Sequence, residues 1–293
     1  MIQFRPMTEA DVPAAVEAFD TSFLAMRARF GLPVTGTSIL DERWRRERTR
    51  HFQRTDPEGS WVAEDAGAIV GLSQSFVREG YWVLSQLATV PGRQGAGVGR
   101  ELLRLALTHG DPTAPGTIQS SRDPKAMALY ASFGFALHPV MAGWGLVRRD
   151  GVERPEDVVR FEPGQVTTRE LDVVTAVDRA VRGSARTQDI ESMLTQPGTR
   201  LLLRGDEGYA VAKDERLVTL GARTEDAASQ VLRTMLAETP AGETVEVNWI
   251  TGSQQWAIRV LVEAGVELQP YGPVMVRNMA GPPSPYIPSG GYG

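Results

Sequence analysis

Residues 92–107, GRQGAGVGRELLRLAL, place three glycines at alternate positions directly before a helical run. Gly95, Gly97 and Gly99 let the backbone adopt positive φ and approach a bulky group closely, although each glycine costs conformational entropy. Apolar residues at 98, 102, 105 and 106 follow with the spacing of a helix that has one buried face. The N-terminus of such a helix offers unpaired N–H groups and a partial positive charge, so the segment predicts a phosphate or pyrophosphate site.

Two common nucleotide-binding motifs do not fit this segment. The dinucleotide fingerprint G-x-G-x-x-G requires a different spacing from Gly95-x-Gly97-x-Gly99. The P-loop requires a G-K-[ST] triplet, and none follows the glycines. A tight turn without a ligand is the alternative that an isolated glycine run leaves open.

The sequence on either side of the glycines predicts a sheet flanked by helices. Residues 81–90, YWVLSQLATV, form an almost continuous apolar run typical of a central strand, and Pro91 ends it. Two apolar runs within residues 60–77 are separated by Asp65-Ala66-Gly67, which predicts a hairpin. The other elements predicted for the first half are a strand at 2–7, a helix after the capping-box-like Thr8–Asp11, a helix within 39–53, a strand at 116–121, a helix at 123–135 and strand material within 136–147.

Composition excludes several classes of function. The chain has 293 residues, 42% of them hydrophobic, which predicts two globular domains, and its net charge of −5 argues against nucleic acid or an anionic membrane as the main partner. The absence of cysteine excludes disulfides and thiolate catalysis, and His51, His109 and His138 lack metal-ligand spacing. No segment resembles a signal peptide or a membrane span, so we expect a cytoplasmic protein without a metal.

Two motifs resemble those of the Gcn5-related N-acetyltransferase (GNAT) superfamily. Residues 87–99, LATVPGRQGAGVG, resemble motif A, with Gln94, Gly97 and Gly99 at its defining positions. Residues 123–135, DPKAMALYASFGF, resemble motif B, except that Asp123 stands where asparagine is usual. The resemblance covers residues 1–147 and implies an α+β fold, with a mixed, mostly antiparallel central sheet flanked by helices.

The resemblance implies that acetyl-CoA, or another short acyl-CoA, is the cosubstrate. The backbone of Leu87–Thr89, beside a bulge in the strand, would hold the pantetheine arm and polarise the thioester carbonyl. The loop Gln94–Arg100 would bind the pyrophosphate through its N–H groups. The residues expected to bind the cofactor are Leu87, Ala88, Thr89, Gln94, Gly95, Ala96, Gly97, Val98, Gly99, Arg100, Asp123, Ala126, Tyr130 and Phe133.

Proton transfer is assigned to two residues. A thiol has a pKa near ~8.5 and a tyrosine near ~10, so a positioned Tyr130 hydroxyl is expected to protonate the departing CoA thiolate. The alternative for Tyr130 is a packed aromatic ring on an amphipathic helix. Glu79, just before the central strand, is the expected base for the acceptor amine, and a solvated hairpin charge is an equal alternative. Ser85 and Gln86 are candidates to orient a water.

The expected acceptor is a primary amine of a small molecule. By the resemblance, its pocket is lined by the first helix and the hairpins, which carry Phe23, Met26, Arg27, Phe30 and Trp82. The helical spacing of the first four also fits an ordinary core face. Three other functions stay open: an acyl-CoA-binding module without turnover, acylation of a protein amine, and acylation of a thiol-cofactor precursor. The chain is expected to be a monomer or a homodimer.

The second half repeats the first without its chemistry. We expect a GNAT catalytic domain at 1–147, a linker at 148–164 and a degenerate GNAT-like domain at 165–280. Residues 254–268 align with 123–137, which places Leu261 opposite Tyr130 and Gly265 opposite Gly134. At the position that corresponds to the glycine loop, the second half carries Glu225 and Asp226. Their negative charges repel phosphate, so this domain is predicted not to bind CoA.

Residues 281–293, GPPSPYIPSGGYG, which we call the tail segment, are rich in proline and glycine. Such a segment predicts a mobile end. The alternative is that the carboxylate of Gly293 enters the active cleft as a base, with Tyr286 or Tyr292 anchoring the segment.

Overall fold

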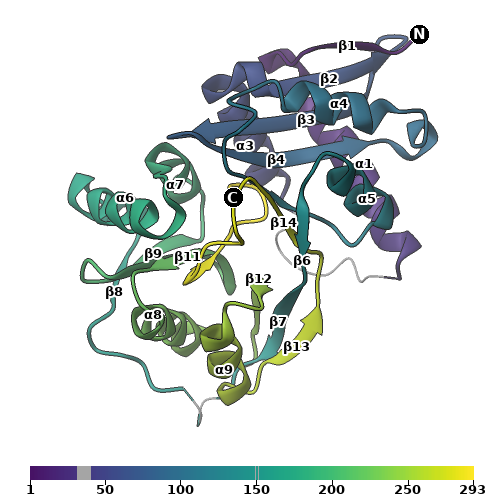
Figure 1. The fold of residues 1–293 in the computed structure, drawn as a ribbon. Coiled ribbons are helices and arrows are strands. Elements are labelled where there is room, and N and C mark those ends of the chain that lie inside the picture. Colours follow the sequence, from purple (N-terminus) through teal and green to yellow (C-terminus); the bar gives the residue numbers. More distant parts are fainter. Residues whose placement is uncertain (32–40, 149, 151) are drawn as a thin grey trace. The chain divides into compact units, whose positions relative to one another are not determined.

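The computed structural model describes residues 1–31, 41–148, 150 and 152–293, and these form two compact units, Met1–Gly116 and Thr117–Gly293. Both units combine a sheet with flanking helices (Figure 1). The elements of unit 1 are β1 (Gln3–Pro6), η1 (Glu9–Asp11), α1 (Val12–Arg29), α3 (Glu42–Thr55), η2 (Pro57–Gly59), β2 (Ser60–Asp65), β3 (Ala68–Arg78), β4 (Tyr81–Thr89), η3 (Pro91–Arg93) and α4 (Val98–Ala106). The helices of unit 2 are α5 (Pro124–Ser132), α6 (Thr168–Arg182), α7 (Thr187–Leu194), α8 (Glu225–Glu238) and α9 (Gln255–Glu263), with the 3-10 turn η5 (Pro163–Gln165) before α6.

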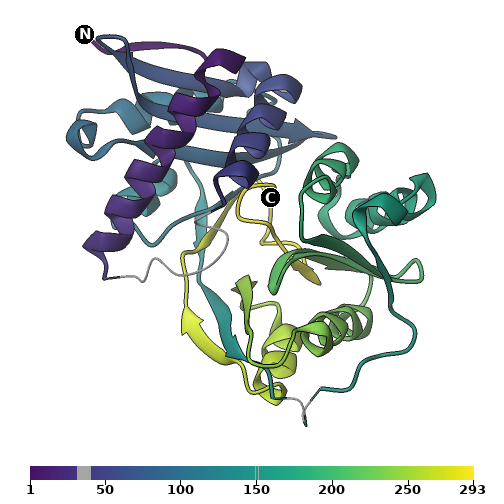
Figure 2. The same cartoon turned by 180° about the vertical axis from the view of Figure 1, so that it is seen from behind.

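The sheet of unit 1 is antiparallel, with the order β1-β2-β3-β4. Helices α1 and α3 cover one face of this sheet and α4 covers the other (Figures 1 and 2). Ala15 and Ala18 of α1 pack with Leu72 on the first face, whereas Leu102 of α4 packs with Val70 on the second. Val70 and Leu72 are two residues apart yet serve opposite faces, because the β2–β3 register shifts at Val70 and breaks the alternation of β3. The sheet therefore has an apolar layer on both sides.

Residues with positive φ form the two hairpin turns of unit 1. The β2–β3 turn uses Ala66 and Gly67 at φ +51° and +83°, and the β3–β4 turn uses Glu79 and Gly80 at +46° and +81°. Two-residue hairpin turns of this kind require positive φ, which glycine adopts at low cost. The predicted hairpin, central strand and glycine-led helix are all confirmed.

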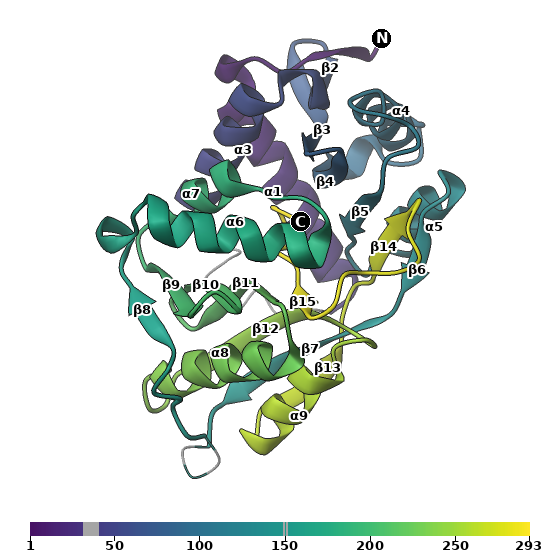
Figure 3. The same ribbon diagram turned by 60° about the vertical axis from the view of Figure 1, so that its left-hand side comes forward.

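Unit 2 contains a seven-membered strand path with the order β13-β7-β12-β11-β10-β9-β8. Helices α8 and α9 pack on one face of it and α6 and α7 lie on the other (Figure 3). A large apolar core lies beneath α8 and α9, where Val231, Met235 and Trp256 are buried with the inward side chains of the strands. β5 (Gly116–Gln119) begins at the last residue of unit 1 and continues into unit 2. The other strands of unit 2 are β6 (Ala136–His138), β7 (Val140–Leu146), β8 (Val159–Phe161), β9 (Thr199–Arg204), β10 (Gly208–Lys213), β11 (Arg216–Ala222), β12 (Thr244–Thr251), β13 (Glu267–Pro270), β14 (Val274–Arg277) and β15 (Tyr286–Ile287).

In unit 2, two strands from the first half of the sequence pair with two strands from the second half. β6 pairs antiparallel with β14, and β7 pairs antiparallel with β13. β7 also pairs with β12, while β14 lies beside β5, where the N–H of Ser120 donates to the carbonyl of Pro273 at 2.9 Å. β7, from the first half of the sequence, therefore lies between β12 and β13 in the sheet that the second half mainly forms.

Several features of the second half differ from the expectation. The expected linker at 148–164, of which 149 and 151 lie outside the described residues, contains β8, which pairs with β9. Helix α7 and strands β13 to β15 were not predicted. The tail segment is not a mobile end, because Tyr286, Ile287 and Tyr292 are 1–3% exposed.

Candidate active site

The glycine loop joins β4 to α4 on the surface of unit 1. Residues 91–97 are all exposed, and Gly95 and Gly97 have φ values of +86° and +81°. A Cβ at Gly92, Gly95 or Gly97 would meet no atom within 4 Å, so open space adjoins the loop. The positive φ at Gly95 and Gly97 therefore favours glycine, and a bulky group has room to reach the N–H groups.

The N-terminus of α4 has no side-chain cap. Its N-cap residue is Gly97, and the next helical residue, Val98, is buried. The first N–H groups of a helix lack intrahelical partners and carry the positive end of its dipole. Gln94 donates from Nε2 to the carbonyl of Thr89 at 3.1 Å, which ties the loop to the end of β4. Arg93 pairs with Asp65.

The corresponding helix of unit 2, α8, begins in a different way. Only Arg223 and Thr224 separate it from β11, and the hydroxyl of Thr224 accepts a hydrogen bond from the N–H of Ala227 at 3.1 Å. Its first turn carries Glu225 and Asp226. Anions are disfavoured where a helix start is already capped and bears two carboxylates, so only α4 of these two helices offers an anion site.

The register between β3 and β4 shifts near the middle of β4. Gln74 pairs with Gln86 and Ser75 pairs with Leu84, so Ser85 is an extra residue, as in a β-bulge. The carbonyl of Thr89, at the end of the strand, accepts from the Ser22 hydroxyl of α1 at 2.5 Å. Leu87 and Thr89 thus lie between the bulge and the glycine loop, with Ala88 buried under α1.

Tyr130 is the one buried residue of α5, at 5% exposure. Burial raises the pKa of the Tyr130 hydroxyl, and the negative charge of Asp123 raises it further. Asp123 is the N-cap of α5 and accepts from the N–H of Lys125 at 2.9 Å. Ala126 and Phe133 are half-buried on the same helix and at its C-cap. The tyrosine therefore keeps its proton throughout the neutral pH range.

Residues 56–137 match the family model of the acetyltransferase (GNAT) domain, a span that contains both the glycine loop and α5. This part of the chain belongs to the GNAT family. A mycothiol acetyltransferase of Streptomyces avermitilis is 34% identical over 89 residues, which are 28% of this chain and 29% of that protein. The chain therefore aligns with less than a third of this relative.

Two solved structures share the whole fold. A proposed acetyltransferase of Pyrococcus horikoshii superimposes with a TM-score of 0.77 at 16% identity, over 100% of this chain and 96% of that chain. A tandem GNAT protein from the clavulanic acid biosynthesis pathway superimposes with a TM-score of 0.56 at 16% identity, over 94% and 98%. The expected α+β fold with a two-domain GNAT layout is confirmed.

The GNAT domain carries Glu79 at the tip of the β3–β4 hairpin, where it is exposed. The glycine loop follows the other end of β4. Six residues of strand, at about 3.3 Å each, put roughly 20 Å between Glu79 and the bulge at Ser85. The structure therefore separates Glu79 from the part of β4 that lies near the loop.

Gln86, the residue after the bulge, belongs to a chain of buried polar side chains in unit 1. It donates from Nε2 to Oε1 of Gln74 at 2.6 Å and to the hydroxyl of Thr49 at 3.0 Å. Its Oε1 accepts from Arg48 of α3 at 3.3 Å. The amide of Gln86 is thus held by protein groups rather than directed to a water.

The expected acceptor residues fall into two sets. Phe23, Met26, Arg27 and Phe30 are half-buried at the C-terminal end of α1, where the Arg27 guanidinium lies 5.8 Å from the ring centre of Phe23. Trp82 is instead a core residue at 2% exposure, and its indole donates to the carbonyl of Ala106 at 3.3 Å. The first set could meet a ligand without repacking, whereas Trp82 belongs to the interior of unit 1.

Helix α9 reproduces the end of α5, as the sequence alignment predicts. The N–H of Phe135 donates to the carbonyl of Tyr130, and the N–H of Val266 donates in the same way to the carbonyl of Leu261. Gly134 and Gly265 follow the two helices with φ of +84° and +72°. The side chain opposite Tyr130 is Leu261, which is fully buried and has no proton to give.

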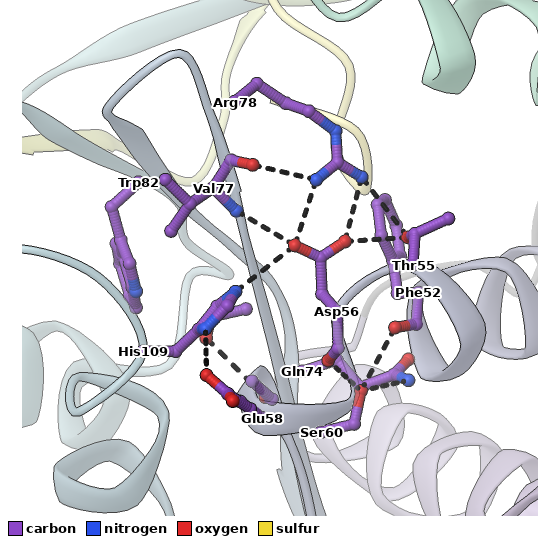
Figure 4. Close-up of polar contacts among 12 residues, drawn as sticks. Phe52, Thr55, Asp56, Glu58, Ser60, Gln74, Val77, Arg78, Trp82 and His109 are labelled. Carbon is purple, nitrogen blue, oxygen red and sulfur yellow. Dashed lines mark hydrogen bonds and ion pairs between the residues drawn. The ribbon is translucent and has the colours of Figure 1, made fainter.

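A buried ionic cluster in unit 1 was not found from the sequence. Asp56 accepts hydrogen bonds from Arg78 at 2.9 and 2.8 Å and from the N–H of Val77 at 3.1 Å, and His109 Nε2 lies 3.2 Å from it (Figure 4). Burial alone would raise the pKa of Asp56, but hydrogen bonds from His109 and Arg78 outweigh it and hold the pKa well below its usual range. Residues 56, 78 and 109 are far apart in sequence, and no local pattern links them.

The described residues contain neither a candidate membrane span nor a candidate metal cluster. No helix among them combines the length and the apolar character needed to cross a membrane. Within the same residues, no three His, Asp or Glu side chains are grouped so that they would hold a metal ion.

Proposed function

We propose that this protein is an acyl-CoA-dependent N-acyltransferase that transfers acetyl from acetyl-CoA to a primary amine of a small molecule. The observation that carries the proposal is the contrast between α4 and α8. α4 begins at an exposed glycine loop without a cap, and α8 begins at a threonine cap followed by two acids. In this proposal the N–H groups of Gln94–Arg100 bind the pyrophosphate and the backbone of Leu87–Thr89 holds the pantetheine arm.

The reaction proceeds by direct attack in a ternary complex. The neutral amine nitrogen bonds to the thioester carbonyl carbon, the carbon–sulfur bond breaks, and CoA leaves as a thiolate. Tyr130 gives its proton to this sulfur, and the proton that the nitrogen loses on forming the amide passes through water and restores the Tyr130 hydroxyl. Because Glu79 lies roughly 20 Å along the strand from the bulge, we assign deprotonation of the amine to a route through water rather than to contact with Glu79.

The acceptor is proposed at the level of its class. The relative from Streptomyces avermitilis is named for mycothiol, so a precursor of a thiol cofactor is a second candidate acceptor alongside other small amines. The residues proposed to contact the acceptor are Phe23, Met26, Arg27 and Phe30. Because Trp82 is buried in the core of unit 1, we propose that it supports the fold and does not contact the acceptor. We propose a monomer or a homodimer in the cytoplasm.

We further propose that 1–147 and 165–280 are two GNAT repeats, joined at 148–164, which exchange their last strands. The matching ends of α5 and α9 support this relation. The second repeat has Leu261 where the first has Tyr130, and we propose that it binds no coenzyme.

The proposed function is tested by a CoA-release assay against an amine library that includes cysteinyl amines. We expect release with at least one amine and a large loss in a Tyr130→Phe variant. Acetyl-CoA binding without release for any amine would favour the acyl-CoA-binding module instead.

A further inference from the structure

The tail segment lies inside unit 2 in the manner of a bound peptide. β11 and β12 run parallel and pair only where Arg216 meets Glu246. Beyond that point, β15 of the tail segment pairs antiparallel with β11, with Ile287 opposite Leu220 and Tyr286 opposite Gly221 (Figure 3). The tail segment thus adds a short strand where the two parallel strands no longer pair, which is how an extended peptide augments a sheet.

Buried polar side chains of unit 2 bind the backbone of the tail segment. Gln254, which is fully buried, donates from Nε2 to the carbonyl of Pro283 at 2.9 Å and accepts from the N–H of Tyr286 at 3.3 Å. Thr219, also fully buried, donates from its hydroxyl to the carbonyl of Ile287 at 2.9 Å. Both side chains also bond to the rest of unit 2: Gln254 accepts from the indole of Trp256 at 2.7 Å, and Thr219 accepts from Arg186 at 2.8 Å. They therefore join the tail segment to the fold.

The end of the tail segment is held by a buried arginine. Arg186 of the α6–α7 turn is 1% exposed and donates from Nη1 to the carbonyl of Tyr292 at 2.9 Å. Its other donors reach Asp178, Tyr209 and Thr219. The guanidinium carbon of Arg186 also lies 5.4 Å from the ring centre of Tyr286.

One glycine of the tail segment fits against a tryptophan. A Cβ at Gly290 would lie 3.2 Å from the indole of Trp249 on β12, closer than most real contacts. Trp249 stands at the irregular point of β12, with φ of +64°. By contrast, Ser284 is exposed and its hydroxyl makes only long contacts of 3.4 Å.

We propose that unit 2 contains a peptide-binding site whose occupant is the chain's own segment Pro283–Gly293, and that this site can be emptied and refilled. The site recognises an extended backbone through Gln254, Thr219 and Arg186. It also takes an aromatic side chain at position 286, and the indole of Trp249 disfavours a side chain larger than that of glycine at position 290. This site is distinct from the proposed transfer of acetyl groups and does not depend on it.

The experiment cuts the backbone just before the tail segment, so that the segment is held in its site only by non-covalent contacts. A site-specific protease sequence is inserted between Met279 and Gly281, beside the exposed Ala280, and the purified full-length protein is cut. We expect the cut protein to keep its circular dichroism spectrum, to retain the segment through gel filtration, and to exchange it for a fluorescent peptide of sequence 283–293. The uncut protein, whose site is filled, should bind no labelled peptide.

Peptide variants supply matched controls without altering the protein. Gly290→Val in the peptide should weaken binding by at least about tenfold because of the contact with Trp249, and Ser284→Ala should bind within about threefold of the native peptide. Equal binding of the Gly290→Val peptide, or a folded cut protein that takes up no peptide, would overturn the proposal. Loss of the fold on cutting would also overturn it, since the segment would then be part of the core.

Discussion

The hydroxyl of Thr224 accepts a hydrogen bond from the N–H of Ala227 at 3.1 Å and closes the N-terminus of α8. The N-cap of α4 is Gly97, which has no side chain to make such a bond. The two helices follow strands in comparable positions of the sequence, so one chain contains both an open and a closed version of the same element. The proposed coenzyme site depends on this difference.

The threonine cap of α8 is expected to contribute to the free energy of unfolding. Thr224→Ala removes the cap and should cost about 1 kcal/mol in the free energy of unfolding. It should not create acetyl-CoA binding in unit 2, because Glu225 and Asp226 stay in the first turn. Denaturant unfolding and calorimetric titration measure the two quantities. A second bound acetyl-CoA in this variant would show that the cap alone closes the site.

Tyr130→Phe should lower kcat by about 100-fold or more and leave the KM for acetyl-CoA within about threefold, because only the proton to sulfur is lost. Tyr271→Phe, which keeps the ring contact with Trp249, is the matched control and should be neutral. An undiminished kcat in Tyr130→Phe would remove the proton-donor role.

The pH profile of kcat provides a separate prediction for Tyr130. Burial raises the pKa of this hydroxyl above its usual value of ~10, and the residue acts in its protonated form. The rate should therefore show no fall from loss of the Tyr130 proton below about pH 10. A decline between pH 7 and 9 that disappears in Tyr130→Phe would contradict this assignment.

Glu79→Gln should change kcat/KM by less than about threefold, because the hairpin tip lies roughly 20 Å from the bulge in β4. The assay is the same CoA-release measurement on the best amine of the library. A loss of about 100-fold would restore Glu79 as the direct base.

Asp56→Asn should lower the free energy of unfolding by about 3 kcal/mol at pH 7, because it leaves the buried Arg78 without its charge partner. The folded-state pKa of Asp56 is lowered, so its stabilising effect is present above the unfolded pKa of ~3.9 and fades as pH falls towards the folded value. The gap between the two proteins should thus narrow below about pH 4. Glu42→Gln, which breaks an exposed pair with Arg46, should cost less than about 0.5 kcal/mol at either pH.

Local patterns predicted most of unit 1 and of the glycine loop. The hairpin followed from Asp65-Ala66-Gly67, the central strand from its apolar run, and the start of α4 from glycines with positive φ. These signals are contained in a few neighbouring residues. The comparison of α9 with α5 also succeeded, because the glycine that ends each helix has a fixed spacing from residues 130 and 261.

Features that depend on distant pairing were not predictable from the sequence. β7 can pair with strands of either half by its composition, and only the folded chain shows it between β12 and β13. The Asp56 cluster joins residues 56, 78 and 109, which lie in three separate segments of the chain. The proline and glycine content of the tail segment suggested mobility, whereas its order comes from Gln254, Thr219 and Arg186, none of which is near it in sequence.

The most direct test of the account is calorimetric titration of acetyl-CoA into the wild-type protein and a Gly97→Asp variant. Aspartate tolerates the positive φ of this position and can cap α4, so the variant should fold, but it places a negative charge beside the expected diphosphate. We predict one bound acetyl-CoA per wild-type chain and affinity at least about tenfold weaker in Gly97→Asp, with Gly92→Ala as an unaffected control. Equal affinity in Gly97→Asp, or two bound molecules per chain, would contradict the account.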